Sequence, residues 1–166
     1  MNLETSLRTH TCGELTEKDA GKEVTLCGWV HVRRDLGKLI FIDLRDRYGI
    51  TQVVFKPDKK GMLKKAEKLR KEFVIRVWGK VKKRPKNTEN PKLKTGKIEV
   101  VAEKLEIINK SLPLPVAIED EIVAGEEVRL KYRFLDLRRP VMQRNLEMRD
   151  KVAMAVREYM HSKGFI

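Results

Sequence analysis

The sequence predicts a small closed β-barrel of five strands, with one helix between the third and fourth strands, followed by a hinge and a helical region. Two observations predict this fold class. Residues 1–110 contain five short apolar-rich segments of strand length, and the first of them alternates apolar and polar residues with the period of a half-buried strand. Between the third and fourth of these segments, apolar residues recur at helical spacing instead.

The first predicted strand covers residues 23–32, and Gly28 within it would tolerate a bend or a bulge. The residues that fall on its expected core face are Val24, Leu26, Val30 and Val32.

The second and third predicted strands, residues 39–46 and 50–55, are joined by a turn that ends at Gly49. Side chains alternate along a strand, so one face of the second strand is expected to pack in the core and the other to face outward. Phe41 would then point outward, beside charged residues. The expected core residues of this strand are Ile40, Ile42 and Leu44.

The remaining elements complete the barrel. An amphipathic helix is predicted within residues 59–73, a fourth strand at 73–84, an exposed loop at 85–96 and a fifth strand at 97–109 that could be broken into two. The order β-β-β-α-β-β is that of an OB-fold, a five-stranded Greek-key barrel that binds oligonucleotides on the face of its second and third strands. The helix is expected to bury Met62, Leu63, Ala66 and Leu69.

Positive charge is concentrated in the predicted barrel. The formal net charge is +13, and residues 1–110 hold 27 of the 37 Lys and Arg but 15 of the 24 Asp and Glu. This distribution favours a polyanionic partner, with nucleic acid as the leading candidate, although a Lys-rich surface of a heat-stable protein is an alternative. On such a barrel an outward Phe41 would be a stacking platform for a base, unless a loop or another domain covers it.

Cysteine and histidine usage does not predict a zinc site, because Cys12 and Cys27 form no C-x-x-C pair and the three histidines are scattered. Nothing near the start resembles a signal peptide, and no apolar run approaches the length that spans a membrane. We therefore expect a cytoplasmic protein with no membrane partner.

Residues 111–139 are expected to form a linker or hinge region, and residues 140–166 the first helix of a further domain. Prolines and an acidic patch mark the beginning of the hinge, and the helical region that follows should stop near Pro140. A longer helix is predicted to end at Gly164, with the last two residues beginning a strand. Because the apolar face of this helix is wide, the chain is expected to be an N-terminal piece of a larger protein.

Two stretches, "GWVHVRRDLGKLIFIDLRDRYGITQVVF" and "EVRLKYRFLDLRRPVMQRNLEMRDKV", closely resemble aspartyl-tRNA synthetase of the bacterial type, a class II enzyme. The resemblance spans essentially the whole chain. It implies an N-terminal OB-fold that binds the anticodon stem-loop of tRNA(Asp), a hinge, and the helical start of a class II α+β catalytic domain. The last helix resembles the beginning of class II motif 1, which implies a homodimer for the full-length enzyme.

The resemblance also implies that the full-length enzyme joins aspartate to its tRNA through an aspartyl-adenylate, with ATP and Mg²⁺. Motifs 2 and 3, which bind ATP and activate the amino acid in this family, are absent from the 166 residues. No catalytic residue, metal ligand or cofactor is therefore assigned to this chain, and it is expected to be inactive alone. The alternatives are a free-standing OB-fold nucleic-acid-binding protein and a related asparaginyl- or lysyl-tRNA synthetase.

Carried over residue by residue, the resemblance implies four anticodon contacts. Phe41 would stack on the central uridine, and Arg34 and Gln52 would read the edge of that base. Glu99 would lie near the first anticodon base. The residues expected along the phosphate path are Lys82, Lys83, Arg84 and Lys86.

Three neighbouring features of the first motif refine this expectation. Arg33 and Asp35 are expected to orient the loop through a salt bridge. Val32 stands where the family often has an arginine, which removes one possible phosphate contact. Leu36 stands where relatives that also charge the asparagine tRNA often have histidine, which favours an enzyme selective for the aspartate tRNA.

Overall fold

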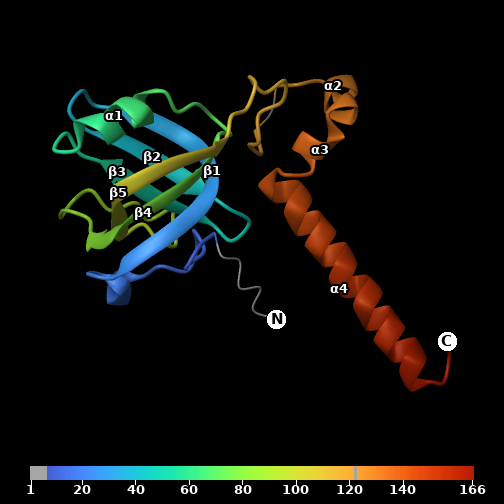
Figure 1. Ribbon diagram of the computed structural model, residues 1–166. Coiled ribbons are helices and arrows are strands. Elements are labelled where there is room, and N and C mark those ends of the chain that lie inside the picture. Colours follow the sequence, from blue (N-terminus) through green and yellow to red (C-terminus); the bar gives the residue numbers. More distant parts are fainter. Residues whose placement is uncertain (1–6, 122) are drawn as a thin grey trace. The chain divides into compact units, whose positions relative to one another are not determined.

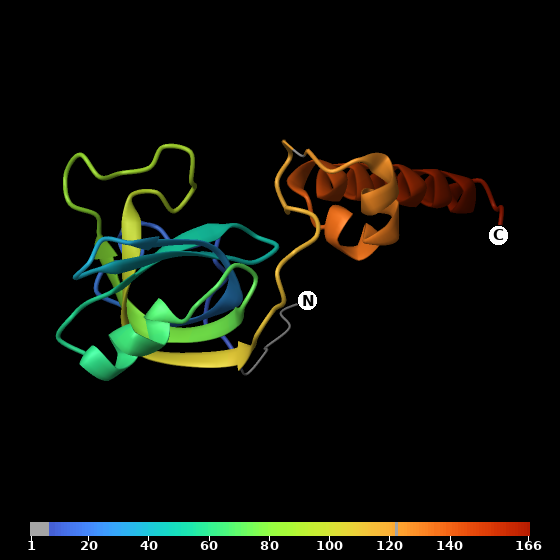
Figure 2. The same cartoon turned by 90° about the horizontal axis from the view of Figure 1, so that it is seen from above.

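Five strands close into one barrel in the order β1-β2-β3-β5-β4 (Figures 1 and 2). All neighbouring strands pair antiparallel except β3 and β5, which pair parallel over a short stretch. A single helix, α1, lies in the chain between β3 and β4, so the predicted OB-fold is confirmed. The bounds are β1 Glu23–Asp35, β2 Ile40–Arg45, β3 Ile50–Phe55, α1 Lys60–Glu67, β4 Val74–Lys83 and β5 Ile98–Asn109.

This computed structural model describes residues 7–121 and 123–166. Residues 1–6 of the predicted 1–110 domain and residue 122 of the predicted hinge lie outside the described residues. The chain divides into two units, one that ends at Leu112 and one that extends from Pro113 to Ile166.

The barrel interior contains the core face predicted for β2. Ile40, Ile42 and Leu44 are each at most 1% exposed, and full burial of such a side chain stabilises the fold by about 1.5–3 kcal/mol. Residues outside the strands complete this core. Those from α1, from the segment that follows it and from the N-terminal segment are Met62, Ala66, Leu69, Cys12 and Leu15.

Strand β1 differs from the prediction in two ways. It extends to Asp35, three residues beyond the predicted end, because its last residues pair with β2. It also carries a bulge at His31 rather than a bend at Gly28. The expectation that Val32 lies on the core face is therefore wrong, because the extra residue moves Val32 to the face that it shares with Asp43.

Gly28 has a different role from the predicted one. A Cβ atom at this position would lie 2.4 Å from the carbonyl oxygen of Arg45 on β2, so a side chain cannot fit there. The close approach of two strands, and not a bend, explains the glycine.

Helix α1 is shorter than predicted, and β5 is not broken. After α1 the backbone of Glu72 takes a left-handed conformation with φ 63°, and its N–H donates to Val30 O over 2.7 Å. This contact with β1 redirects the chain into β4. Strand β5 stays continuous, and two register shifts against β4 take the place of the predicted break.

The second unit contains α2 (Glu126–Lys131), α3 (Arg133–Asp136) and α4 (Pro140–Ser162). The first helical region stops at Asp136, close to Pro140 as predicted, and Pro140 itself begins the longer helix α4, because the first helical position needs no backbone N–H donor. Gly164, with φ 83°, ends the helix region, and the final two residues form no strand here.

A buried ion pair fixes the start of α4. Arg139 Nη1 lies 2.8 Å from Asp136 Oδ1, and both residues are at most 7% exposed. Asp120 accepts the backbone N–H of Val141 over 2.8 Å, which satisfies one free donor at the helix N-terminus. Within the described residues, no helix combines the length and the hydropathy that a membrane crossing requires.

Candidate nucleic-acid interface

A groove of about 530 Å³ lies on the outside of the barrel. Its walls bring together residues that are far apart in the sequence, from the ends of β1 and β4 and from β2, β3 and β5. All four residues predicted to contact the anticodon line this groove, and so does one residue of the predicted phosphate path. They are Arg34, Phe41, Gln52, Glu99 and Arg84.

A chain of hydrogen bonds connects the polar residues of the groove. Arg34 donates from Nη2 to Asp43 Oδ1 over 2.7 Å and from Nη1 to Asp43 Oδ2 over 3.0 Å. Arg34 Nη2 also donates to Gln52 Oε1 over 3.2 Å, and Gln52 Nε2 donates to Glu99 Oε2 over 3.2 Å. The four side chains from β1, β2, β3 and β5 therefore form one continuous network.

The bulge at His31 places Arg34 in this network. In a regular strand, Arg34 would share the face of Val30, which is fully buried in the core. The extra residue reverses that alternation, and Arg34 then lies opposite Phe41 on β2. Residues directly opposite each other in an antiparallel pair share a face, so Arg34 and Phe41 both face the groove.

Phe41 is half-buried, and its strand neighbours Ile40 and Ile42 are buried in the core. It lines the groove beside Val54, which faces it from β3. Leu36, at the rim, is 70% exposed. An aromatic side chain, a buried aliphatic floor and a polar network are the components that bind an unstacked base.

Arg84 is held at the edge of the groove by backbone acceptors. Nε donates to Ile98 O over 3.0 Å and Nη1 to Thr88 O over 3.3 Å, while Nη2 is buried without a hydrogen-bond partner among the described residues. Burial lowers the pKa of the Arg84 guanidinium, and the carboxylates of Glu99 and Asp43 act in the opposite direction. Arg84 therefore lines the groove with one N–H group that makes no hydrogen bond, and that group is buried.

The structure does not place the predicted phosphate-path residues on one face. Lys82 lies opposite Glu99 in the strand pairing, on the outer face of the barrel. Lys83 lies opposite the buried Ile98, and its Nζ is 3.6 Å from Glu17 Oε1.

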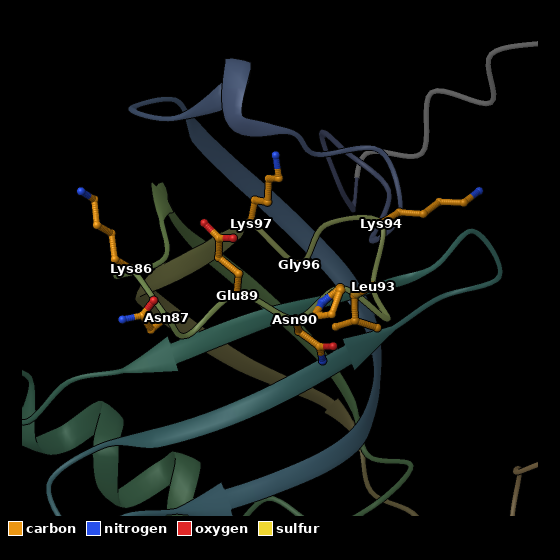
Figure 3. Close-up of a pocket in the computed structure, with 9 residues that line it drawn as sticks. Lys86, Asn87, Glu89, Asn90, Leu93, Lys94, Gly96 and Lys97 are labelled. Carbon is orange, nitrogen blue, oxygen red and sulfur yellow. The ribbon is translucent and has the colours of Figure 1, made fainter.

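Lys86 lies in the β4–β5 loop, which surrounds a second cavity of about 570 Å³. Figure 3 shows Lys86, Lys94 and Lys97 extending from this loop in different directions. Lys97 Nζ lies 3.3 Å from Glu17 Oε2, so one of these three ammonium groups already has an acidic partner.

Asp43 is the functional candidate that the sequence analysis did not identify. The sequence contained a signal for Asp43, because this residue lies two positions after Phe41, on the same face of the strand, and opposite Gln52.

The expected salt bridge between Arg33 and Asp35 is present, with Nη1 and Oδ2 3.3 Å apart. Asp35 also accepts the backbone N–H of Gly37 over 3.1 Å, which connects this pair to the β1–β2 loop.

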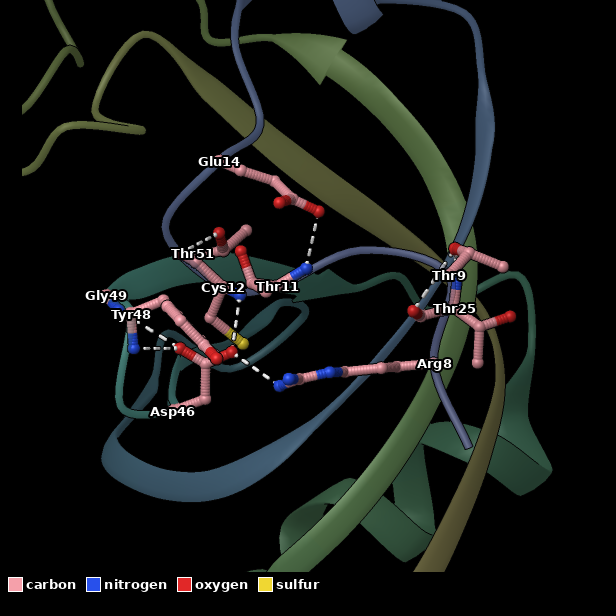
Figure 4. Close-up of polar contacts among 10 residues, drawn as sticks. All are labelled: Arg8, Thr9, Thr11, Cys12, Glu14, Thr25, Asp46, Tyr48, Gly49 and Thr51. Carbon is pink, nitrogen blue, oxygen red and sulfur yellow. Dashed lines mark hydrogen bonds and ion pairs between the residues drawn. The ribbon is translucent and has the colours of Figure 1, made fainter. Parts of the chain in front are cut away.

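A second polar cluster surrounds Asp46, at the β2–β3 turn (Figure 4). Its carboxylate accepts from Arg8 Nη1 and from the backbone N–H groups of Cys12, Tyr48 and Gly49, over 2.8–3.0 Å. The cluster attaches the N-terminal segment to the turn. Burial, reinforced by Asp46, raises the pKa of the Cys12 thiol well above its usual value.

None of the side chains that the structure describes form a group of three or more His, Cys, Asp or Glu residues able to hold a metal ion.

Comparison with known families agrees with the barrel. Residues 24–108 match the family described as "OB-fold nucleic acid binding domain". The chain belongs to this family. Residues 125–166, beyond the OB-fold domain, match the family described as "tRNA synthetases class II (D, K and N)".

Curated relatives and solved structures show which enzymes the OB-fold domain and the helices after it resemble. An Aspartate–tRNA(Asp/Asn) ligase of Desulfosudis oleivorans is 55% identical over 160 residues, which is 96% of this chain and 27% of the relative. That of Moorella thermoacetica is 54% identical over 95% of this chain and 26% of the relative. The resemblance to bacterial aspartyl-tRNA synthetases is thereby confirmed.

Among solved structures, the asparaginyl-tRNA synthetase of Pyrococcus horikoshii complexed with asparaginyl-adenylate has a TM-score of 0.79 and 32% identity, covering 93% of this chain and 34% of that chain. The chain spans about a quarter of the length of the curated relatives that it matches.

Proposed function

We propose that this OB-fold domain binds the anticodon stem-loop of an aspartate tRNA and supplies tRNA selection to an aspartate–tRNA ligase. One observation carries the proposal: a half-buried aromatic residue, Phe41, shares a groove with a hydrogen-bonded set of charged and amide side chains. Single-stranded RNA is recognised by such a combination, because splayed bases offer a flat face and a hydrogen-bonding edge.

The groove residues have separate roles in this proposal. Phe41 stacks on the central uridine, while Arg34 and Gln52 hydrogen-bond to its edge, and Glu99 lies beside the first anticodon base. Arg84 and the outer-face Lys82 contact phosphates near the groove. Two further predicted phosphate contacts, Lys83 and Lys86, lie elsewhere on the barrel and are proposed only as contacts farther along the RNA.

The complete enzyme would consume ATP and aspartate with Mg²⁺ and form an aspartyl-adenylate. No step of that chemistry is assigned to residues of this chain, which we expect to be inactive alone. We also propose a homodimer for the whole enzyme and a cytoplasmic location. Exposed apolar residues along α4, among them Met148, Val152 and Tyr159, support a subunit contact there.

Acceptance of asparagine tRNA is the open question of specificity. Relatives named for both tRNAs favour acceptance, whereas Leu36 at the rim of the groove favours selectivity for aspartate. Because the two anticodons differ only at their third base, a direct comparison of the two stem-loops answers the question.

The test is equilibrium binding of labelled RNA stem-loops to this chain. We expect the aspartate anticodon loop to bind more tightly than a loop with a scrambled anticodon. Affinity should fall with salt, with a log–log slope of about −0.7 for each single-strand phosphate neutralised. Equal affinity for the scrambled loop would instead support a free-standing OB-fold nucleic-acid-binding protein, and a flat salt response would mean that the lysines form only a solvated surface.

A further inference from the structure

The two neighbours of Gln52 determine how its amide is oriented. An arginine side chain can only donate hydrogen bonds, and an ionised carboxylate can only accept them. Arg34 therefore requires the amide oxygen on its side, and Glu99 requires the amide nitrogen on the other, as the contacts at 3.2 Å show. The reversed amide would place N–H against N–H and oxygen against oxygen.

A fixed amide can distinguish bases that a freely rotating amide cannot. A primary amide offers two donors and two acceptor positions, and in Gln52 one of each remains for a base in the groove. At positions 4 and 3 of the base, uridine presents an acceptor and then a donor, whereas cytidine presents a donor and then an acceptor. An amide that could turn over would pair with either base, whereas an amide held in one orientation pairs with only one.

Arg34 can hold the amide only if Arg34 itself is held. Its side chain is 46% exposed, and its two hydrogen bonds to Asp43, at 2.7 and 3.0 Å, are the bidentate pair that fixes a guanidinium plane. The Asp43 side chain is 12% exposed, and it lies on β2 directly opposite Gln52. Asp43 thus anchors the group that orients the amide from a rigid strand beneath the groove.

We propose that Asp43 is a specificity-determining positioning residue: through Arg34 it fixes the orientation of the Gln52 amide and so makes the groove select uridine over cytidine. The inference rests on the proposed anticodon-binding function. Asp43 is not among the residues that line the groove, and both of its oxygens accept from Arg34, so we place it behind the residues that contact the base. The ratio of affinities for the two bases, and not affinity itself, is the quantity that Asp43 controls.

The experiment measures Kd for two stem-loops that differ only in uridine or cytidine at the central anticodon position. Asp43→Asn keeps the shape of the side chain but turns one acceptor into a donor, which breaks the bidentate pair. We expect the uridine preference to fall roughly tenfold, the size of one good bidentate discrimination. Glu103→Gln is the matched control: it removes the same charge at an exposed position on β5 and should leave the ratio unchanged.

Two further variants separate positioning from a merely structural role. Arg34→Lys keeps the charge but replaces the planar guanidinium with an ammonium group that cannot form the bidentate pair with Asp43, so it should lower the ratio as Asp43→Asn does. In a Gln52→Ala background, Asp43→Asn should change the ratio much less than it does in the wild type, because the amide is gone and only the contact of Arg34 with the base is left to disturb. If Asp43→Asn does not fold, a uridine preference that survives in Arg34→Lys still overturns the role of Asp43.

The outcomes distinguish the two levels of the argument. A wild-type protein with no uridine preference overturns the proposed function of the groove, and this inference with it. A wild-type preference that survives in Asp43→Asn or Arg34→Lys overturns only the role of Asp43. Equal weakening of both loops by Asp43→Asn also overturns that role, because it shows that the residue supports the fold and not the choice of base.

Discussion

Asp43 and Asp46 are three residues apart and both buried, at 9% and 8% exposure for the whole residue and 12% and 4% for the side chain, yet their partners differ completely. Asp46 receives hydrogen bonds from three backbone N–H groups and from Arg8, which ties the N-terminal segment to the β2–β3 turn. Both carboxylate oxygens of Asp43 accept hydrogen bonds from the exposed side chain of Arg34, which lines the groove. Burial alone therefore does not separate a structural carboxylate from a functional one, whereas the position of its partner does.

The largest expected effect comes from Asp46. Asp46→Ala should lower the free energy of unfolding by about 3–5 kcal/mol, because it leaves buried donors and the Arg8 guanidinium without an acceptor. Urea denaturation measures this loss. RNA affinity per folded molecule should not change, since Asp46 does not line the groove.

A different result would remove the contrast between the two aspartates. If Asp46→Ala unfolds no more easily than wild type but binds RNA more weakly, then the N-terminal segment and the turn belong to the RNA-binding surface. Asp43→Asn is the corresponding control. Its thermal unfolding temperature should change little, whereas its preference for uridine should fall.

Two adjacent residues of β2, one in the core and one in the groove, provide a second test of the contrast between structural and functional positions. Ile42→Ala should lower the free energy of unfolding by roughly 2–5 kcal/mol, because Ile42 is fully buried in the barrel core. Phe41→Ala should instead weaken binding of the aspartate loop by about 1–3 kcal/mol, and that of the cytidine loop by a similar amount, because stacking accepts any base. The measurements are urea denaturation and RNA titration of both variants.

Phe41 would be a core residue if its replacement melted the domain while RNA affinity per folded molecule stayed intact. That outcome would also make Ile42 and Phe41 equivalent, and the two faces of β2 would have to be reassigned.

Local pattern was sufficient to predict the parts of the fold that depend on alternation along one strand. Ile40, Ile42 and Leu44 are buried as expected, and Phe41 lies on the other face because strand side chains alternate. The order of strands and helix, together with the family resemblance, was sufficient for the OB-fold and the groove. Arg34, Gln52 and Glu99 meet there because their strands are neighbours in that barrel.

Features that depend on contact between distant segments could not be predicted from local pattern. The bulge at His31 arises in the pairing of β1 with β2, and it changes the faces of both Val32 and Arg34. Gly49 has no left-handed backbone conformation; a Cβ atom there would lie 2.7 Å from the Cα atom of Gly13, in a segment far away in the sequence. Such close approaches leave no periodic signal.

The smallest expected effect concerns Lys82 and Lys83, which the sequence assigned to one phosphate path and the structure places on different faces. Lys82 shares the outer face with Glu99, which lines the groove. Lys83 lies on the other face of β4, with its Nζ atom 3.6 Å from Glu17 Oε1.

Lys82→Ala should therefore reduce the steepness of the log–log salt dependence of RNA binding by about 0.7, the loss of one single-strand phosphate contact. Lys83→Ala should reduce the slope by less, because its ammonium group already has an acidic partner. The comparison uses stem-loop titrations at several salt concentrations, with both variants losing the same charge at adjacent positions. If Lys83→Ala flattens the slope as much as Lys82→Ala, the RNA backbone crosses both faces of β4, and partner position does not separate the two lysines.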